Sequence, residues 1–199
     1  MKPRESYYSV EELMDFGFAA LGNDVRISRK CSLYGAENMR FGDHVRIDDF
    51  CILSGRIEIG SYVHVAAYCG LFGNAGIFLG DFSGLSSRVS IYSESEDYSG
   101  ASLTNPTIPA EYRKITSRAV HIGRHALVGS GAVILPGVRL GEGVSVGALS
   151  LVTKTLDAWT IYSGIPARRL RARKQDVLAL EAEFMADARF FPPATVQLN

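Results

Sequence analysis

The sequence has few cysteines, no excess of either charge and no long apolar run. Only 3 of its 199 residues are cysteine, and none has the Cys-x-x-Cys spacing of a metal or redox site, so we expect reduced thiols. The 21 basic side chains balance the 21 acidic ones. A protein that neutralises nucleic-acid phosphates usually carries a basic excess, so no nucleic-acid partner is expected.

Membrane and export signals are also missing from this sequence. No stretch approaches the roughly 20 apolar residues of a membrane-spanning helix. The first residues, Met1 to Glu5, lead into polar sequence and not into the apolar core of a signal peptide. With 47% hydrophobic residues, the chain is expected to be one soluble cytoplasmic domain with a sizeable core and no membrane insertion.

Glycine is abundant, at 20 of 199 residues, and it accompanies a repeat of six. Large apolar residues recur at this period in two runs. The runs are Leu21, Ile27, Leu33, Phe41, Ile47, Leu53, Ile59, Val65, Leu71, Leu79, Leu85 and Ile91, then Ile122, Val128, Ile134, Leu140, Val146 and Val152. A period of six does not fit a helix of 3.6 residues per turn. A unit this short buries its apolar side only by stacking on its neighbours, which predicts an all-β solenoid.

The breaks in the repeat predict a three-sided solenoid. The spacing departs from six after Leu33, Leu71 and Ile91, each time after a multiple of three units. All insertions would then leave from one edge of the prism. The outward residues of the face before that edge are apolar or small, as at Ile52, Gly70, Ser90, Val133 and Leu151. Such a stripe is typical of a subunit interface.

Two helices are expected beside the solenoid. Ser9 and Glu12 form a capping-box pattern that predicts a short helix over residues 10–16. Apolar residues at helical spacing predict a second helix over about 175–189. The chain then divides into an N-terminal helical segment (1–19), the solenoid (20–167) with an inserted loop (92–119), and a basic segment with the C-terminal helix (168–199).

The units "IGSYVH", "LGDFSG", "VGSGAV" and "LGEGVS" resemble the hexapeptide repeat of the left-handed parallel β-helix acyltransferases. The resemblance extends over about residues 20–170. It implies a triangular prism with three hexapeptides per turn. It also implies a homotrimer with active sites between neighbouring prisms.

The end of the repeats is similar to the coenzyme A site of this family. "GALSLVTK" is followed by "SGIPARRLRARK", and the resemblance implies backbone contacts to coenzyme A at Ser130 and Ala148. It also implies that Thr153 and Lys154 lie along the pantetheine arm and that Arg168 meets phosphate. Independently, residues 168–174 carry five positive charges, which suits a polyanionic ligand. The resemblance therefore implies acetyl-coenzyme A as co-substrate, direct transfer to the acceptor and no metal.

The inserted loop contains the candidate acceptor residues. Sugar acetyltransferases of this fold have a catalytic histidine near the loop's start, where "RVSIYSESEDYSG" has Glu96 followed by Asp97. A carboxylate is a weak base for activating a hydroxyl, but it can orient an amine. This difference favours the nucleotide-linked amino-sugar N-acetyltransferases, with a role in surface polysaccharide (O-antigen-type) biosynthesis. The outward-facing His64 is a candidate base, and a solvated acidic turn is the plain alternative for Glu96 and Asp97.

The sequence also allows three other functions. One is O-acetylation of a galactoside-like sugar, with His64 as the base. Another is a zinc lyase similar to the γ-carbonic anhydrases, which share the fold and need three imidazoles on one metal. His64, His121 and His125 would have to converge for that. The third is a non-catalytic solenoid, because a fold alone does not define a function.

Overall fold

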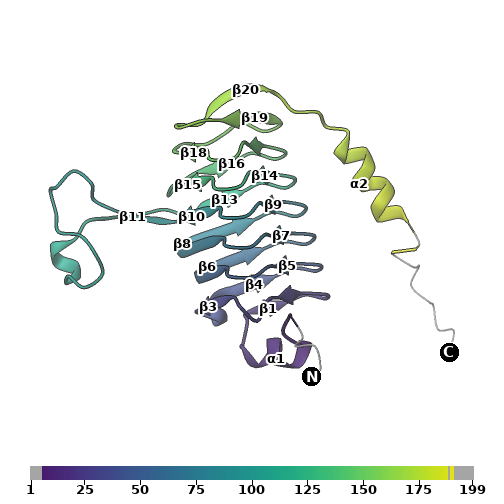
Figure 1. The fold of residues 1–199 in the computed structure, drawn as a ribbon, viewed down its shortest axis with the longest axis horizontal. Coiled ribbons are helices and arrows are strands. Elements are labelled where there is room, and N and C mark those ends of the chain that lie inside the picture. Colours follow the sequence, from purple (N-terminus) through teal and green to yellow (C-terminus); the bar gives the residue numbers. More distant parts are fainter. Residues whose placement is uncertain (1–5, 188, 191–199) are drawn as a thin grey trace.

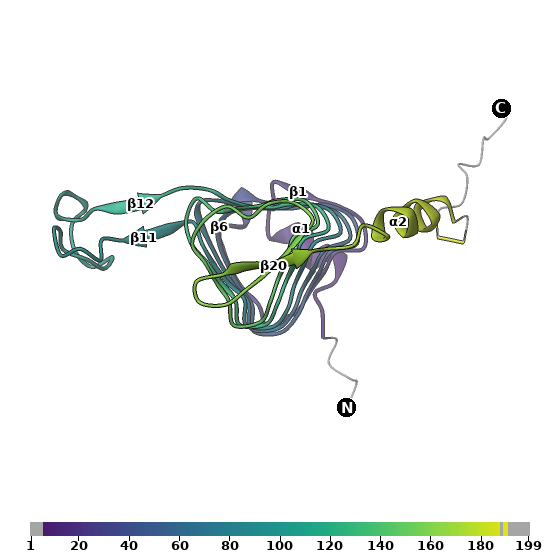
Figure 2. The same ribbon diagram turned by 90° about the horizontal axis from the view of Figure 1, so that it is seen from above.

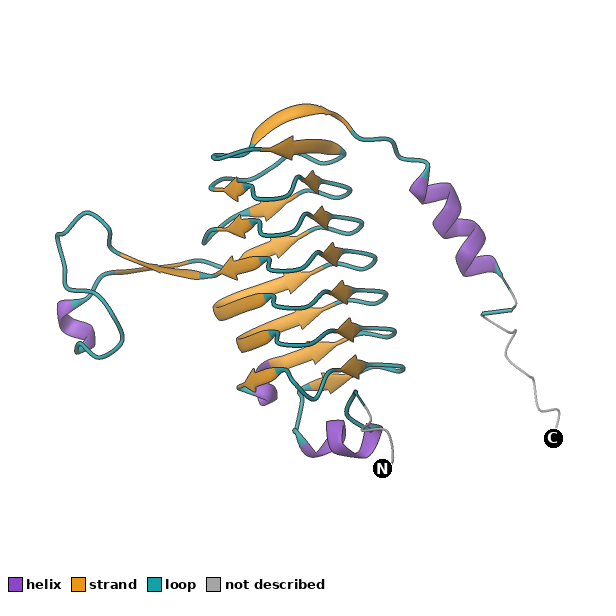
Figure 3. Cartoon of the chain, in the orientation of Figure 1, coloured by secondary structure: helices purple, strands orange, loops and turns teal. Residues whose placement is uncertain are grey.

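The computed structural model describes residues 6–187, 189 and 190, and they form a three-sided parallel β-helix (Figure 1). Viewed along its axis, the coil stack has a triangular outline, with an arm leaving one corner and a helix lying at another (Figure 2). Figure 3 shows the strands as short segments separated by turns. The predicted all-β solenoid is confirmed. All three cysteines are free.

Two sheets build the three faces of the prism. The ten-stranded sheet bends around one corner and forms two faces, and the eight-stranded sheet forms the third. The ten strands are β1 (Ala20–Leu21), β3 (Ser32–Tyr34), β4 (Met39–Phe41), β6 (Ile52–Ile59), β8 (Gly70–Leu79), β10 (Ser90–Tyr92), β13 (Val120–Ile122), β15 (Val133–Ile134), β16 (Arg139–Leu140) and β18 (Leu151–Val152). The eight are β2 (Arg26–Ile27), β5 (Arg46–Ile47), β7 (His64–Val65), β9 (Gly84–Leu85), β14 (Leu127–Val128), β17 (Ser145–Val146), β19 (Thr160–Ser163) and β20 (Arg168–Ala172).

The six-residue repeat places one large apolar side chain from each unit inside the prism. In the eight-stranded sheet, Ile47, Val65 and Leu85 lie in register on successive coils and are buried. The repeat thus builds a continuous core, because each coil covers the apolar side of the next. In the first coil Leu21 and Leu33 are only partly buried, whereas Ile27 is fully buried.

Two of the three corners turn through residues with left-handed backbone angles. Corner I turns at Asp24, His44, Tyr62, Phe82, His125, Gly143 and Trp159, and corner II turns at Phe50, Tyr68, Arg88, Gly131 and Leu149. Neighbouring turns approach so closely that a Cβ on Gly60 would lie 2.9 Å from the backbone nitrogen of Asp81. Only glycine fits at that position.

The third corner, corner III, releases the insertions. Tyr34, Phe72 and Tyr92 stand at the points where the repeat breaks, and pairing connects them through β6. The longest insertion forms the arm, a hairpin of β11 (Glu94–Glu96) and β12 (Ile115–Ser117) that carries the short helix η2 (Ala110–Tyr112). A shorter one contains η1 (Ala36–Asn38). All insertions leave from one edge, as the repeat breaks predict (Figure 2).

Both predicted helices are present, with shifted ends. Helix α1 (Val10–Asp15) has a complete capping box, in which Glu12 Oε2 accepts from the Ser9 amide at 2.8 Å. Helix α2 (Val177–Ala186) lies beside corner I, where Phe184 packs edge-on against Tyr62. No helix in the described ranges is long and apolar enough to cross a membrane.

The basic segment is not a separate unit at its start. Residues 168–172 form β20, which pairs antiparallel with β19 and closes the last coil.

Of the outward residues predicted for the interface face, Ile52 is exposed, whereas Gly70 is buried because the Phe72 ring lies over it.

Candidate active site

A groove lies on the eight-stranded sheet beside corner II. Its volume is about 280 Å³, and its lining consists of His64, Ala66, Gly84, Leu85, Ser86, Ser87, Leu127 and Ser130. His64, Gly84 and Leu127 occupy the same register position on three successive coils. Gly84 has no side chain, so the groove is the gap between the His64 imidazole and the Leu127 side chain. We call it the corner II groove.

Asp48 orients the His64 imidazole at the edge of this groove. His64 Nε2 lies 2.8 Å from Asp48 Oδ2, and Arg46 Nε donates to the other carboxylate oxygen at 2.7 Å. Burial opposes ionisation of Asp48, but the hydrogen bonds from His64 and Arg46 prevail and lower its pKa. An ionised carboxylate only accepts hydrogen bonds, so Nε2 carries the hydrogen and Nδ1 of a neutral imidazole keeps a lone pair.

Nothing in the sequence pattern indicates this pair. Asp48 stands two positions after Arg46 in the repeat, where nothing separates it from an ordinary surface residue. It meets His64, 16 positions further along the chain, because their two successive coils stack on each other. Its side chain is 18% exposed, against 51% for His64, so the carboxylate is the sheltered partner and the imidazole the accessible one.

The predicted donor residues Ser130 and Ala148 both lie at corner II. Each stands just before a residue with a left-handed turn, Gly131 and Leu149, and both are exposed. The amide of Leu149 donates to the Ser130 carbonyl at 2.8 Å, so the two positions adjoin. Gly131, which follows Ser130, has no side chain, and the Leu149 side chain lies over its Cα.

Thr153, Lys154 and Arg168 lie at the C-terminal end of the coil stack. All three are exposed, and in the described part of the chain neither Lys154 nor Arg168 has a carboxylate within ion-pair distance. Both cations are therefore open to an anionic ligand. Arg173 differs from the rest of the basic segment, because its guanidinium donates to the carbonyls of His125 and Gly143 at 2.7 and 3.0 Å and holds the chain to corner I.

Glu96 and Asp97 lie on the arm. Glu96 pairs with Arg113 across the hairpin at 3.4 Å, and its second oxygen has no hydrogen-bond partner among the described residues. Asp97 accepts from the amides of Ser99 and Ala101 and from the Ser102 hydroxyl. The hydrogen bonds from Ser99 are the main cause of its lowered pKa. Both carboxylates thus help to shape the arm.

One chain does not bring all the predicted site residues together. His64, Ser130 and Ala148 lie along corner II and the sheet beside it, whereas the arm with Glu96 and Asp97 projects from corner III (Figures 1 and 2). The arm exposes Tyr98, Leu103 and Tyr112, and the Tyr98 side chain is 93% exposed. No described part of the same chain covers these aromatic and apolar groups.

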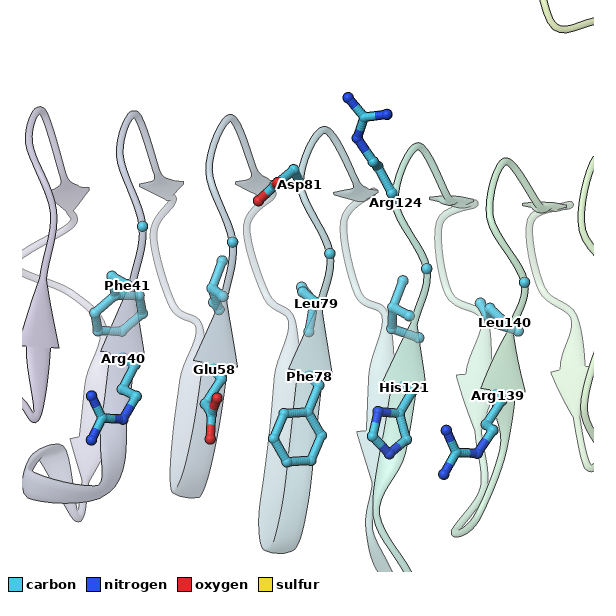
Figure 4. A pocket seen from close by; sticks show the side chains of 17 residues that line it. Arg40, Phe41, Glu58, Phe78, Leu79, Asp81, His121, Arg124, Arg139 and Leu140 are labelled. Atoms are coloured by element: carbon cyan, nitrogen blue, oxygen red, sulfur yellow. The ribbon is translucent and has the colours of Figure 1, made fainter. Parts of the chain in front are cut away.

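A second, wider groove of about 810 Å³ lies on the face between corners III and I. Figure 4 shows its outward side chains as one row across successive coils: Arg40, Glu58, Phe78, His121 and Arg139. The His121 ring stacks on Phe78 at 4.7 Å, and burial together with Arg139 lowers its pKa. Neither His64 nor His125 lines this groove, and the described residues of one chain contain no group of three potential metal ligands.

Residues 119–154 match the bacterial transferase hexapeptide family (six repeats). A dTDP-4-amino-4,6-dideoxy-D-glucose acyltransferase from Escherichia coli is 42% identical over 92% of this chain and 97% of its own. A protein named "Putative lipopolysaccharide biosynthesis O-acetyl transferase WbbJ", from Escherichia coli K12, is 29% identical over 70% of this chain and 71% of its own.

A solved structure of AntD, an N-acyltransferase from Bacillus cereus, is also similar. In complex with dTDP and 3-hydroxybutyryl-CoA it superposes with a TM-score of 0.90, at 46% identity over 92% of this chain and 97% of that chain. Another AntD structure holds dTDP-4-amino-4,6-dideoxyglucose and coenzyme A. Solved variants of AntD replace one serine or one aspartate, ten positions apart in that protein.

Proposed function

The chain belongs to the hexapeptide-repeat family of bacterial acyltransferases, and we propose that it transfers an acetyl group from acetyl-coenzyme A to the amino group of a nucleotide-linked amino sugar. The similarity to AntD carries this proposal, because AntD is an N-acyltransferase solved with a dTDP-linked amino sugar and coenzyme A together. The E. coli relative that acts on the same dTDP-sugar supports it over almost the whole chain.

Acetyl-coenzyme A fits the open side of corner II. The exposed backbone at Ser130 and Ala148 suits the amide groups of a pantetheine arm. Lys154 and Arg168 suit the phosphates of coenzyme A, because no carboxylate of the described residues neutralises them. The thioester, when bound, supplies an activated acetyl carbonyl. The site then needs residues that orient the acceptor and exclude water.

His64 and Asp48 are proposed to handle the proton of the amino group. The sugar nitrogen attacks the thioester carbonyl, a C–N bond forms and the C–S bond breaks, and the sulfur leaves as a thiolate. Nδ1 of His64 accepts the proton that the nitrogen loses, while Asp48 keeps the opposite ring nitrogen protonated. Backbone N–H groups at corner II stabilise the negative oxygen of the tetrahedral intermediate.

The site is proposed to form between two copies of a homotrimer. Glu96 and Asp97 of one copy would then reach the corner II groove of the next, and the exposed aromatic groups of the arm would be covered. Ser86 with Glu96, and Ser87 with Asp97, have the ten-residue spacing of the AntD positions that were substituted. These pairs support an acceptor site made from the groove and the arm.

The proposed reaction suits surface polysaccharide biosynthesis. Nucleotide-linked amino sugars are precursors of such polymers, and the WbbJ relative bears a lipopolysaccharide biosynthesis name. Acetyl-coenzyme A and nucleotide sugars are both cytoplasmic metabolites, so a cytoplasmic enzyme is proposed.

Thiol release from acetyl-coenzyme A tests this function. The acceptors are dTDP-4-amino-4,6-dideoxyglucose, the unlinked amino sugar, a simple galactoside and no acceptor. Turnover that depends on the nucleotide-linked amine is expected, at a kcat/KM at least 100-fold above that of the galactoside. Equal or better use of the galactoside would contradict the proposal and favour O-acetylation.

A further inference from the structure

The segment before helix α1 lies along the free edge of β2, the first strand of the eight-stranded sheet. An antiparallel bridge joins Tyr7 to Ser28 of the first coil, and the Tyr8 amide donates to the Ile27 carbonyl at 3.0 Å. We call residues 6–9 the N-terminal strap. An added edge segment of this kind covers backbone groups that the first coil leaves unpaired.

Helix α1 fixes the direction of the strap. The strap leads directly into the helix, where Glu12 pairs with Arg29 of the first coil. The Tyr8 ring packs edge-on against Phe16 at 5.0 Å, so Tyr8 faces the end of the prism. Because neighbouring residues of an extended segment point to opposite sides, Tyr7 is directed to the outer face of the sheet.

The Tyr7 hydroxyl reaches the second coil, where it meets the proposed His64–Asp48 pair. It donates to Asp48 Oδ1 at 3.4 Å, the oxygen that also accepts from Arg46 Nε at 2.7 Å. Asp48 chiefly, and Tyr7 with it, raise the pKa of Arg46, so the three groups form one network. The other carboxylate oxygen, Oδ2, lies 2.8 Å from His64 Nε2. Two donors thus hold one side of the carboxylate and direct its second oxygen at the imidazole.

The Asp48 carboxylate has three side-chain donors among the described residues, and Tyr7 is the one that comes from outside the coil stack. The following coil presents Gly84 in register with His64, so no charged side chain of that strand approaches the imidazole. Of the residues that line the corner II groove, His64 alone is ionisable. The orientation of Asp48 therefore depends on Arg46 and Tyr7.

We propose, on the basis of the proposed function, that Tyr7 is a positioning residue for the reaction. Its hydroxyl holds Asp48 in the orientation that keeps the hydrogen on Nε2 of His64, so that Nδ1 keeps its lone pair for the proton of the amine. Tyr7 touches neither substrate and acts through Asp48. The N-terminal strap thereby connects the N-terminal end of the prism to the acceptor site.

Kinetics with dTDP-4-amino-4,6-dideoxyglucose and acetyl-coenzyme A test this role. Tyr7→Phe keeps the ring and removes the hydroxyl. It is expected to lower kcat about fivefold, the scale of one hydrogen bond, and to leave both KM values within twofold of wild type. In the Asp48→Asn background, the same change is expected to alter kcat less than twofold, because Tyr7 acts through the carboxylate.

A second readout does not need turnover. The nitrogen NMR signals of a neutral imidazole show which ring nitrogen carries the hydrogen. The chain has 4 histidines, so the spectrum of His64→Gln assigns the signals of His64. At about pH 8, where an unperturbed imidazole is neutral, wild type is expected to hold the Nε2–H tautomer. Tyr7→Phe is expected to give a mixture of the two tautomers.

Two variants are matched controls. Tyr8→Phe removes the hydroxyl of the neighbouring tyrosine, whose ring lies against Phe16 on the other side of the strap. Ser28→Ala removes a hydroxyl that donates to Asp49, the next carboxylate along the chain. Both variants are expected to keep the wild-type kcat and a single His64 tautomer. Ser28 is fully buried, so its variant is expected to melt at a lower temperature without these losses.

Four results overturn the proposal. In the first, Tyr7→Phe keeps the wild-type kcat or the single tautomer. In the second, Tyr7→Phe raises the acceptor KM, or its fivefold loss persists in the Asp48→Asn background, which makes Tyr7 a direct substrate contact. In the third, Ser28→Ala lowers kcat as much as Tyr7→Phe, which makes the effect a general loss of structure. In the fourth, wild type does not acetylate the amino sugar, and the proposed function then fails together with the role of Tyr7, even where the tautomer responds.

Discussion

At the residue scale, the pairing of His64 with Asp48 is a feature that the sequence pattern does not predict. His64 was a candidate because it is an outward-facing histidine on a strand. Asp48 is not a candidate from the sequence, because its contact with the imidazole depends on how the coils stack and not on a recognisable sequence spacing. Glu96 and Asp97 show the opposite case, since the sequence singled them out and the structure adds that both also shape the arm.

The first prediction concerns this pair. His64→Gln should lower kcat/KM for the nucleotide-linked amine by about 100-fold, the usual scale of general base catalysis. Asp48→Asn should lower it by about tenfold, mainly through kcat, because the imidazole stays but loses its fixed tautomer. Steady-state kinetics measure both. His44 pairs with Asp24 at 3.1 Å away from the groove, so His44→Gln is the matched control and should stay within twofold of wild type.

The second prediction follows from the lowered pKa of Asp48. A carboxyl group whose pKa is lower in the folded state stabilises that state above its unfolded pKa of about 3.9, and the contribution is lost as the pH falls further. Wild type should therefore melt at a higher temperature than Asp48→Asn at pH 7, and the gap should shrink below about pH 4. Melting curves from pH 3 to 7 measure it, and a gap independent of pH would contradict the assignment.

At the element scale, the sequence predicted the elements whose signals are local. The capping box located α1, and the breaks in the repeat located the arm. The start of the basic segment was harder, because a run of arginines does not reveal that residues 168–172 extend a sheet or that Arg173 turns inward. Those features depend on an antiparallel pairing with β19 that no repeat encodes.

The third prediction concerns the attachment of α2. Glu181 is paired with both Arg124 and His125 and is largely buried. Glu181→Gln should weaken the docking of α2 by about 1 kcal/mol, or about fivefold in the open population. Hydrogen exchange over residues 177–186 should then become faster, with exchange in the core strands unchanged. Glu183 is exposed on the same helix, and Glu183→Gln should leave the exchange as in wild type.

At the scale of the whole molecule, the six-residue period predicts the solenoid, and the breaks in the repeat predict its three sides and the edge that releases the insertions. These features can be predicted because each coil repeats the same pattern of inward apolar residues, which must be covered by the next coil. The acceptor site was less predictable. Its proposed parts lie on different corners of one chain, and their meeting depends on how copies assemble.

The fourth prediction tests that assembly. His64→Gln and the double variant Glu96→Gln with Asp97→Asn should each be strongly impaired alone. Co-expressed with different affinity tags and purified as mixed trimers, they should recover about a third of wild-type kcat, because each mixed trimer pairs an intact groove with an intact arm at one of its three sites. No recovery in verified mixed oligomers would show that groove and arm act within one copy.

The central claim is that an amino group attacks the thioester. The most direct measurement is a competition in which dTDP-4-amino-4,6-dideoxyglucose and its 4-hydroxyl counterpart are supplied together at equal concentration with acetyl-coenzyme A, and the products are separated and identified by mass spectrometry. The account predicts that the amide forms at least 100-fold faster than the ester. Comparable amounts of the two products, or an excess of ester, would contradict it.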